Sequence, residues 1–80
     1  MINKNQLIEI IAKALNVPKE KINDQSSTEN LEEWDSLGHL SILTSIDNHT
    51  SGKASKIETL SGCTSLKDLH ETLVENNIGI

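Results

Sequence analysis

Apolar residues that recur at helical spacing limit, more than any other feature, how this chain can fold. Three segments of the 80-residue sequence show this spacing, and none shows the sustained alternation of a half-buried β-strand. The first segment ends near Pro18, the second covers about residues 36–49, and the third covers about residues 65–76. The sequence therefore predicts an all-α fold without a sheet.

Each segment has an apolar face that we expect to pack against the others. The residues on these faces are Leu7, Ile8, Ile11 and Leu15 in the first segment, Leu37, Leu40, Ile42, Leu43 and Ile46 in the second, and Leu66, Leu69, Leu73 and Val74 in the third. Asn3 or Asn5 is expected to cap the first helix and Ser65 the third, because their side chains accept hydrogen bonds from free N–H groups.

A long polar stretch, about residues 18–35, joins the first two helices. Such a loop is unusual in a small domain. Val17, Ile22 and Leu31 are spaced along or beside it, and we expect them to anchor it across the helices. Residues 57–60 are expected to form one short helical turn. The expected fold thus has three long helices, one short helix and a long first loop.

Composition narrows the possible functions. Eighty residues are enough for one domain, residues 1–80. Twelve acidic residues face seven lysines and no arginine, and the net charge of -5 excludes nucleic acid as a partner but favours proteins with basic patches. The single Cys63 rules out an internal disulfide. No apolar run approaches the ~20 residues of a membrane span, and no signal peptide is recognisable, so we expect a cytoplasmic protein.

The most informative segment, residues 32–40, reads Glu-Glu-Trp-Asp-Ser-Leu-Gly-His-Leu. Within it, Asp35, Ser36 and Leu37 lie where the long loop enters the second helix. This junction resembles the attachment motif of the acyl carrier protein family, which is Asp-Ser-Leu at the start of the second helix. Ile22, the apolar pattern of the second helix and the start of the third helix also match the layout of that family.

The resemblance implies both a fold and a function. The fold would be a four-helix bundle of acyl carrier type, and the protein would be a monomer without catalytic activity of its own. A phosphopantetheinyl transferase would move 4′-phosphopantetheine from coenzyme A onto the hydroxyl of Ser36, with Asp35 and Leu37 as recognition neighbours. The terminal thiol of that arm would hold acyl groups as thioesters for loading and transferring enzymes with basic patches. A phosphodiester at a helix N-terminus would also meet free N–H groups and the positive end of the helix dipole.

The resemblance also implies that an acyl chain can enter the core between the helices. The residues expected to line such a pocket are Leu40, Leu43, Ile57, Leu60, Leu66 and Leu69. The alternative is that these side chains serve core packing alone, because small or polar cargo need not enter.

The second helix departs from the pattern of carriers in fatty acid synthesis. Those carriers have several acidic residues along this helix, whereas Gly38 and Ser41 stand at such positions here. The negative charge lies mainly before the helix, and we expect partners to dock on Glu29, Glu32, Glu33 and Asp47. Trp34 is expected to be either a core residue or, if it is exposed, a further docking contact. This departure favours a specialised carrier over one that serves housekeeping fatty acid synthesis.

Other interpretations have less support in the sequence. Asp35, Ser36 and His39 do not resemble a hydrolytic triad, because an acid adjacent to the serine cannot easily orient the histidine. His39, His49 and Cys63 lack the spacing of zinc ligands, so no metal site is expected. Two alternatives stay open. One is a peptidyl or aminoacyl carrier, although the Gly-Gly-x-Ser signature is absent, and the other is a helical interaction module without a cofactor.

Overall fold

Three α-helices make up most of the regular structure in the computed structural model, which describes residues 1–80. They are α1 (Lys4–Leu15), α2 (Ser36–His49) and α3 (Leu66–Glu75). Three short 3-10 turns lie between them: η1 (Lys19–Lys21), η2 (Ala54–Lys56) and η3 (Glu58–Gly62). There are no strands, only two isolated β-bridges. The all-α prediction is confirmed, and η3 overlaps the short turn expected at residues 57–60.

Side chains at the helix starts hold α1 and α3 in place. Of the two asparagines proposed to cap α1, Asn3 does so: its side chain accepts from the Gln6 N–H at 2.8 Å, and the Gln6 side chain accepts from the Asn3 N–H at 3.0 Å. Ser65 caps α3 by accepting from the Asp68 N–H at 3.1 Å. α1 ends at Asn16, which has a left-handed φ of 59°.

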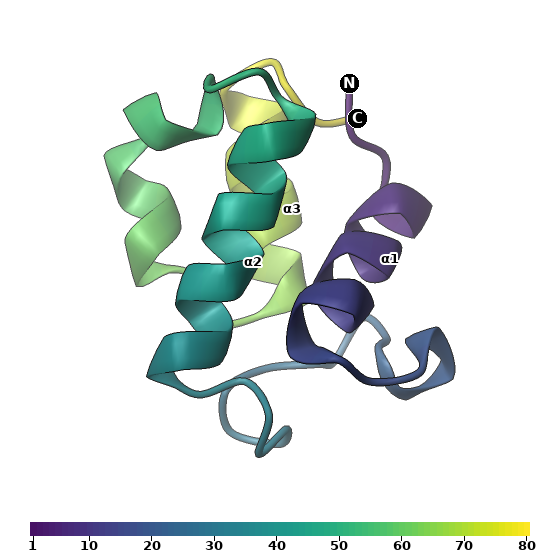
Figure 1. Cartoon of the computed structure of the whole chain (residues 1–80). Coiled ribbons are helices and arrows are strands. Elements are labelled where there is room, and N and C mark those ends of the chain that lie inside the picture. Colours follow the sequence, from purple (N-terminus) through teal and green to yellow (C-terminus); the bar gives the residue numbers. More distant parts are fainter.

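Figure 1 shows how the helices are arranged. α2 lies in the middle, with α1 on one side, the η2–η3 segment on the other and α3 behind it. The two ends of the chain lie side by side, because the Ile2 N–H donates to Ile78 O at 2.9 Å and the Ile80 N–H donates to Ile2 O at 2.9 Å. None of the helices combines the length and the apolar character needed to cross a membrane.

Eighteen apolar residues form one core cluster. The largest fully buried side chains in it are Trp34, Leu7, Ile11, Ile42, Ile46, Leu66, Leu69 and Leu73. Ile22 and Leu31 are also buried, so the prediction that they anchor the first loop is confirmed. Burial of this apolar surface is the main stabilising contribution to so small a fold.

Three residues expected in the core are instead exposed: Leu37 at 75%, Leu40 at 60% and Val74 at 42%. The prediction was wrong for Leu37 and Leu40 because the buried face of α2 runs through Ile42 and Ile46. It was wrong for Val74 because the buried face of α3 runs through Leu66, Leu69 and Leu73. Leu40 comes two residues before Ile42, which places it about 200° around the helix. Apolar residues lie on more than one side of α2, and the side that we expected to be buried includes residues that face solvent.

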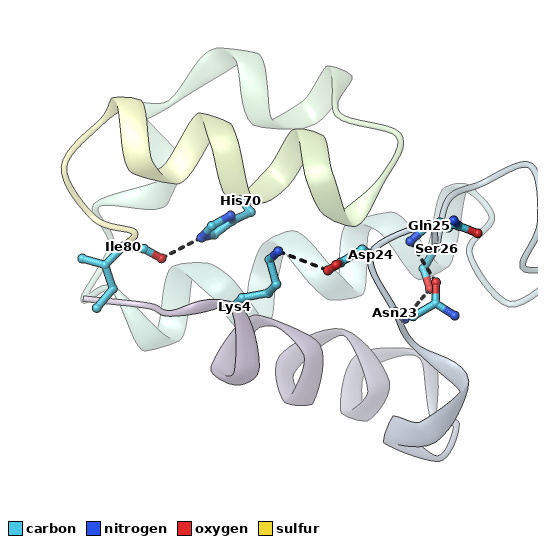
Figure 2. Close-up of polar contacts among 7 residues, drawn as sticks. All are labelled: Lys4, Asn23, Asp24, Gln25, Ser26, His70 and Ile80. Carbon is cyan, nitrogen blue, oxygen red and sulfur yellow. Dashed lines mark hydrogen bonds and ion pairs between the residues drawn. The ribbon is translucent and has the colours of Figure 1, made fainter.

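The first loop is held by its own polar side chains and by contacts with α1 and α3. Figure 2 shows the Lys4–Asp24 ion pair at 3.2 Å, and the turn in which the buried Ser26 hydroxyl accepts from the Asn23 N–H at 2.8 Å. The backbone oxygen of Ser26 accepts from the Leu66 N–H at 3.0 Å, which joins the loop to the start of α3. Figure 2 also shows a contact outside this loop, in which His70 Nε2 lies 2.6 Å from the backbone oxygen of Ile80 and so joins α3 to the end of the chain. The first loop is therefore ordered, although its only helical element is the 3-10 turn η1.

Candidate site at the start of helix α2

Ser36 is the first residue of α2 and is exposed to solvent. The preceding Asp35 has extended backbone angles, and its carboxylate accepts from the Gly38 N–H at 2.8 Å. Asp35 is therefore the N-cap that starts the helix. Its side chain turns toward the first turn of α2, while the adjacent serine stays accessible.

Two backbone N–H groups at this junction have no acceptor within the protein, those of Ser36 and Leu37. An α-helix leaves its first N–H groups unpaired, and here the Asp35 side chain satisfies only the one on Gly38. The free N–H groups and the positive end of the helix dipole favour an anionic group beside Ser36.

Gly38 lets the first loop and the end of α1 pack directly against the first turn of α2. A Cβ at position 38 would collide with the Glu33 carbonyl oxygen and would lie 2.8 Å from Leu15 Cδ2. The position of the loop therefore leaves no room for a side chain at position 38.

Trp34 is 1% exposed, so the expectation that partners dock on its side chain is wrong. Its indole Nε1–H donates to His39 Nδ1 at 3.1 Å, and the two rings stack with centroids 6.2 Å apart. His39 Nε2 lies 3.3 Å from the backbone oxygen of Leu60 in η3. No local pattern in the sequence indicates this role of His39, because its contact with Leu60 depends on a partner 21 residues away.

The acidic residues proposed for docking differ in their surroundings. Glu29 and Glu32 are exposed and form no ion pair. Glu33 accepts a hydrogen bond from Lys21 Nζ at 2.9 Å, and this bond lowers the pKa of the Glu33 carboxyl. Asp47 accepts from the Ser55 N–H at 2.9 Å and so supports the turn after α2. Only the first two present a carboxylate that is free for a partner.

A groove of about 440 Å³ runs between α2 and the η2–η3 segment. Its apolar lining consists of Leu43, Ala54, Ile57 and Leu60, and the polar residues along it are Thr44, Asp47, Ser55, Glu58 and Ser61. Three of the six residues expected to line an acyl pocket lie here. Of the others, Leu66 and Leu69 are fully buried in the core and Leu40 faces solvent.

The geometry offers Ser36 no catalytic base. Both ring nitrogens of His39 are engaged, one by Trp34 and one by Leu60, so neither is free to take a proton from the serine. No group of three His, Cys, Asp or Glu side chains comes together in a way that could hold a metal ion.

Comparison of the chain with models of protein families, with curated proteins and with solved structures found no match. A function is therefore inferred from the residues of the loop–helix junction and from the groove beside it.

Proposed function

We propose that this protein is a carrier of the acyl carrier type, in which the Ser36 hydroxyl is the attachment point of a 4′-phosphopantetheine arm. The observation that carries the proposal is the exposed serine at the first position of α2, beside two unpaired backbone N–H groups. In this proposal η3 takes the place of the short helix in the four-helix carrier fold.

The residues at the junction fit a phosphodiester. The Ser36 oxygen would carry the ester, and the N–H groups of Ser36 and Leu37 lie free to donate to phosphate oxygens. The Asp35 carboxylate is already engaged with the Gly38 N–H, which turns its negative charge toward the helix. When attached, the arm supplies a thiol that carries an acyl group as a thioester.

The surroundings of Ser36 also suit recognition by other proteins. Leu37 and Leu40 are exposed on the same end of α2, and exposed apolar residues next to a modified serine are suitable contacts for a transferase. The unpaired carboxylates of Glu29 and Glu32 precede the helix and would attract basic patches. We infer that a phosphopantetheinyl transferase and acyl-transferring enzymes approach from this end.

The groove beside α2 supports an acyl cargo. Its floor is apolar and its rim is polar, as expected for a site that covers part of a short or medium acyl chain. A small aminoacyl group could occupy the same arm without entering the groove, so the aminoacyl carrier remains the alternative cargo class. The departure of α2 from the acidic pattern favours a specialised pathway for either cargo.

The direct test is mass spectrometry after incubation with coenzyme A and a broad-specificity phosphopantetheinyl transferase. One phosphopantetheine should be added to the wild-type chain and none to Ser36→Ala, with unchanged helical circular dichroism. Ser41→Ala is the matched control, because Ser41 is also an exposed serine of α2 and should leave modification intact. A wild-type chain that several transferases fail to modify would refute the proposal and favour a cofactor-free interaction module.

A further inference from the structure

Two side chains form a hydrogen bond that bridges the sequence around Ser36. Trp34 and His39 lie on either side of the junction, and the bond between Nε1 and Nδ1 closes a ring that contains the whole capped turn. His39 Nε2 extends the connection to Leu60 O, which lies in η3 at the edge of the groove. One histidine thus joins the loop, the first turn of α2 and η3.

The chemistry of the two partners determines the protonation state of His39. An indole Nε1 can only donate, so His39 Nδ1 must be the unprotonated nitrogen that accepts. The ring proton is then on Nε2, which donates to the Leu60 carbonyl oxygen. Addition of a second proton to Nδ1 would place an N–H against the Trp34 N–H and remove the bond.

We propose that neutral His39 is a positioning residue whose contacts with Trp34 and Leu60 connect the Ser36 junction to η3, and that protonation of His39 breaks its bond with Trp34. We call this pair of contacts the tie. Trp34 is fully buried and cannot turn to a new partner without disturbing the core, so the bond holds the backbone before Ser36 in one place. The effect on modification of Ser36 rests on the proposed function. The tie itself and its sensitivity to protons do not.

The acidic groups on the segments that meet at His39 are Glu33 and Asp35 before α2 and Glu58 in η3. Glu33 is paired with Lys21 and the Asp35 carboxylate accepts from the Gly38 N–H, and none of the three forms an ion pair with His39.

The first experiment measures the tie through the fluorescence of Trp34, the only tryptophan in the chain. Because the bond to Trp34 is lost when Nδ1 gains a proton, wild-type emission should change as the solution is acidified within the pH range in which the fold persists. The control is His39→Gln, whose amide offers an acceptor and a donor but does not titrate, and which keeps His49 and His70. Its emission should stay constant over this range. The same pH profile in both proteins would overturn the proposal.

The second experiment measures modification of Ser36 by the transferase. His39→Leu leaves Trp34 Nε1 without an acceptor and removes the His39 contact from Leu60 O, which keeps the Cys63 N–H as a donor. We expect kcat/KM to fall about tenfold, mainly through KM, because the junction is no longer held. His39→Gln should restore the wild-type rate. A folded His39→Leu protein with the wild-type rate would contradict the positioning role.

Trp34→Phe provides a second route if His39→Leu does not fold, because it keeps an aromatic ring in the core and removes the donor together with part of the buried volume of the indole. It should slow modification in the same way as His39→Leu, and a wild-type rate in this variant would also overturn the positioning role. If no protein in the series is modified, including the wild type, the proposed function fails. The fluorescence of Trp34 still decides whether the tie exists.

Discussion

At the scale of single residues, Gly38 is where the backbone leaves no space for a side chain. We predict that Gly38→Ala destabilises the protein by about 1–3 kcal/mol, because the new Cβ must displace both the Glu33 carbonyl oxygen and the Leu15 side chain. Gly62→Ala is the matched control, since a Cβ at Gly62 meets nothing within 4 Å. Urea denaturation of both variants measures the difference. Equal midpoints would show that the loop does not press on the first turn of α2.

Cys63 allows a second test at this scale. Its thiol is buried, and desolvation raises its pKa; the Thr72 hydroxyl 3.4 Å away opposes this increase in part, and the charge of Asp68 adds a smaller one. A raised pKa leaves less reactive thiolate at neutral pH. We therefore expect iodoacetamide to label native apo-protein at least about tenfold more slowly than protein in denaturant.

Slow labelling of Cys63 would distinguish it from the thiol of the proposed 4′-phosphopantetheine arm. Protein that carries the proposed arm should show one fast-labelling group, and that group should persist in Cys63→Ser. Rapid labelling of native unmodified protein would show that Cys63 is more accessible than the structure has it.

At the scale of elements, the two sides of α2 should respond differently to truncation. Ile42 is completely buried, and Ile42→Ala should cost about 2–5 kcal/mol of unfolding free energy, enough to unfold much of so small a domain. Leu40 is 60% exposed, and Leu40→Ala should change stability by less than about 0.5 kcal/mol. Chemical denaturation monitored by circular dichroism tests both. A large loss in Leu40→Ala would mean that α2 packs on the face expected from the sequence alone.

At the scale of the whole molecule, the net charge of -5 should steer basic partners toward the unpaired carboxylates before Ser36. We predict that Glu32→Lys slows loading by an acyl-transferring enzyme roughly severalfold at low salt, and that the defect shrinks as salt is raised. Glu9→Lys makes the same change in net charge on the exposed surface of α1, and it should have a smaller effect. Equal defects would show that overall charge, and not this segment, guides association.

Charge reversal at Glu33 or Asp47, which were also expected to form docking contacts, should have effects that differ from charge reversal at Glu32. Reversal of Glu33 also breaks its ion pair with Lys21, and reversal of Asp47 removes the acceptor of the Ser55 N–H. Loading defects in Glu33→Lys or Asp47→Lys therefore combine lost attraction with a disturbed turn. Asp47→Asn keeps an acceptor oxygen, so it is the better test of the charge at that position.

Local patterns in the sequence were sufficient to predict about where the helices begin. Asn3, Asp35 and Ser65 each precede an apolar repeat, and each caps a helix through a partner three residues away. The position of Ser36 as the exposed first residue of α2 follows from the same signal. These features depend on contacts within one turn, so they can be recognised without knowledge of the rest of the chain.

Which side of α2 is buried, and what surrounds Ser36, were decided only by the tertiary structure. Leucines and isoleucines lie on more than one side of that helix, and the packing of α1 against it selects Ile42 and Ile46 over Leu40. The burial of Trp34, the requirement for glycine at position 38 and the bond from His39 to Leu60 all depend on how the long loop crosses the bundle. Such contacts join residues far apart in the sequence or in different elements, so no local pattern of residues encodes them.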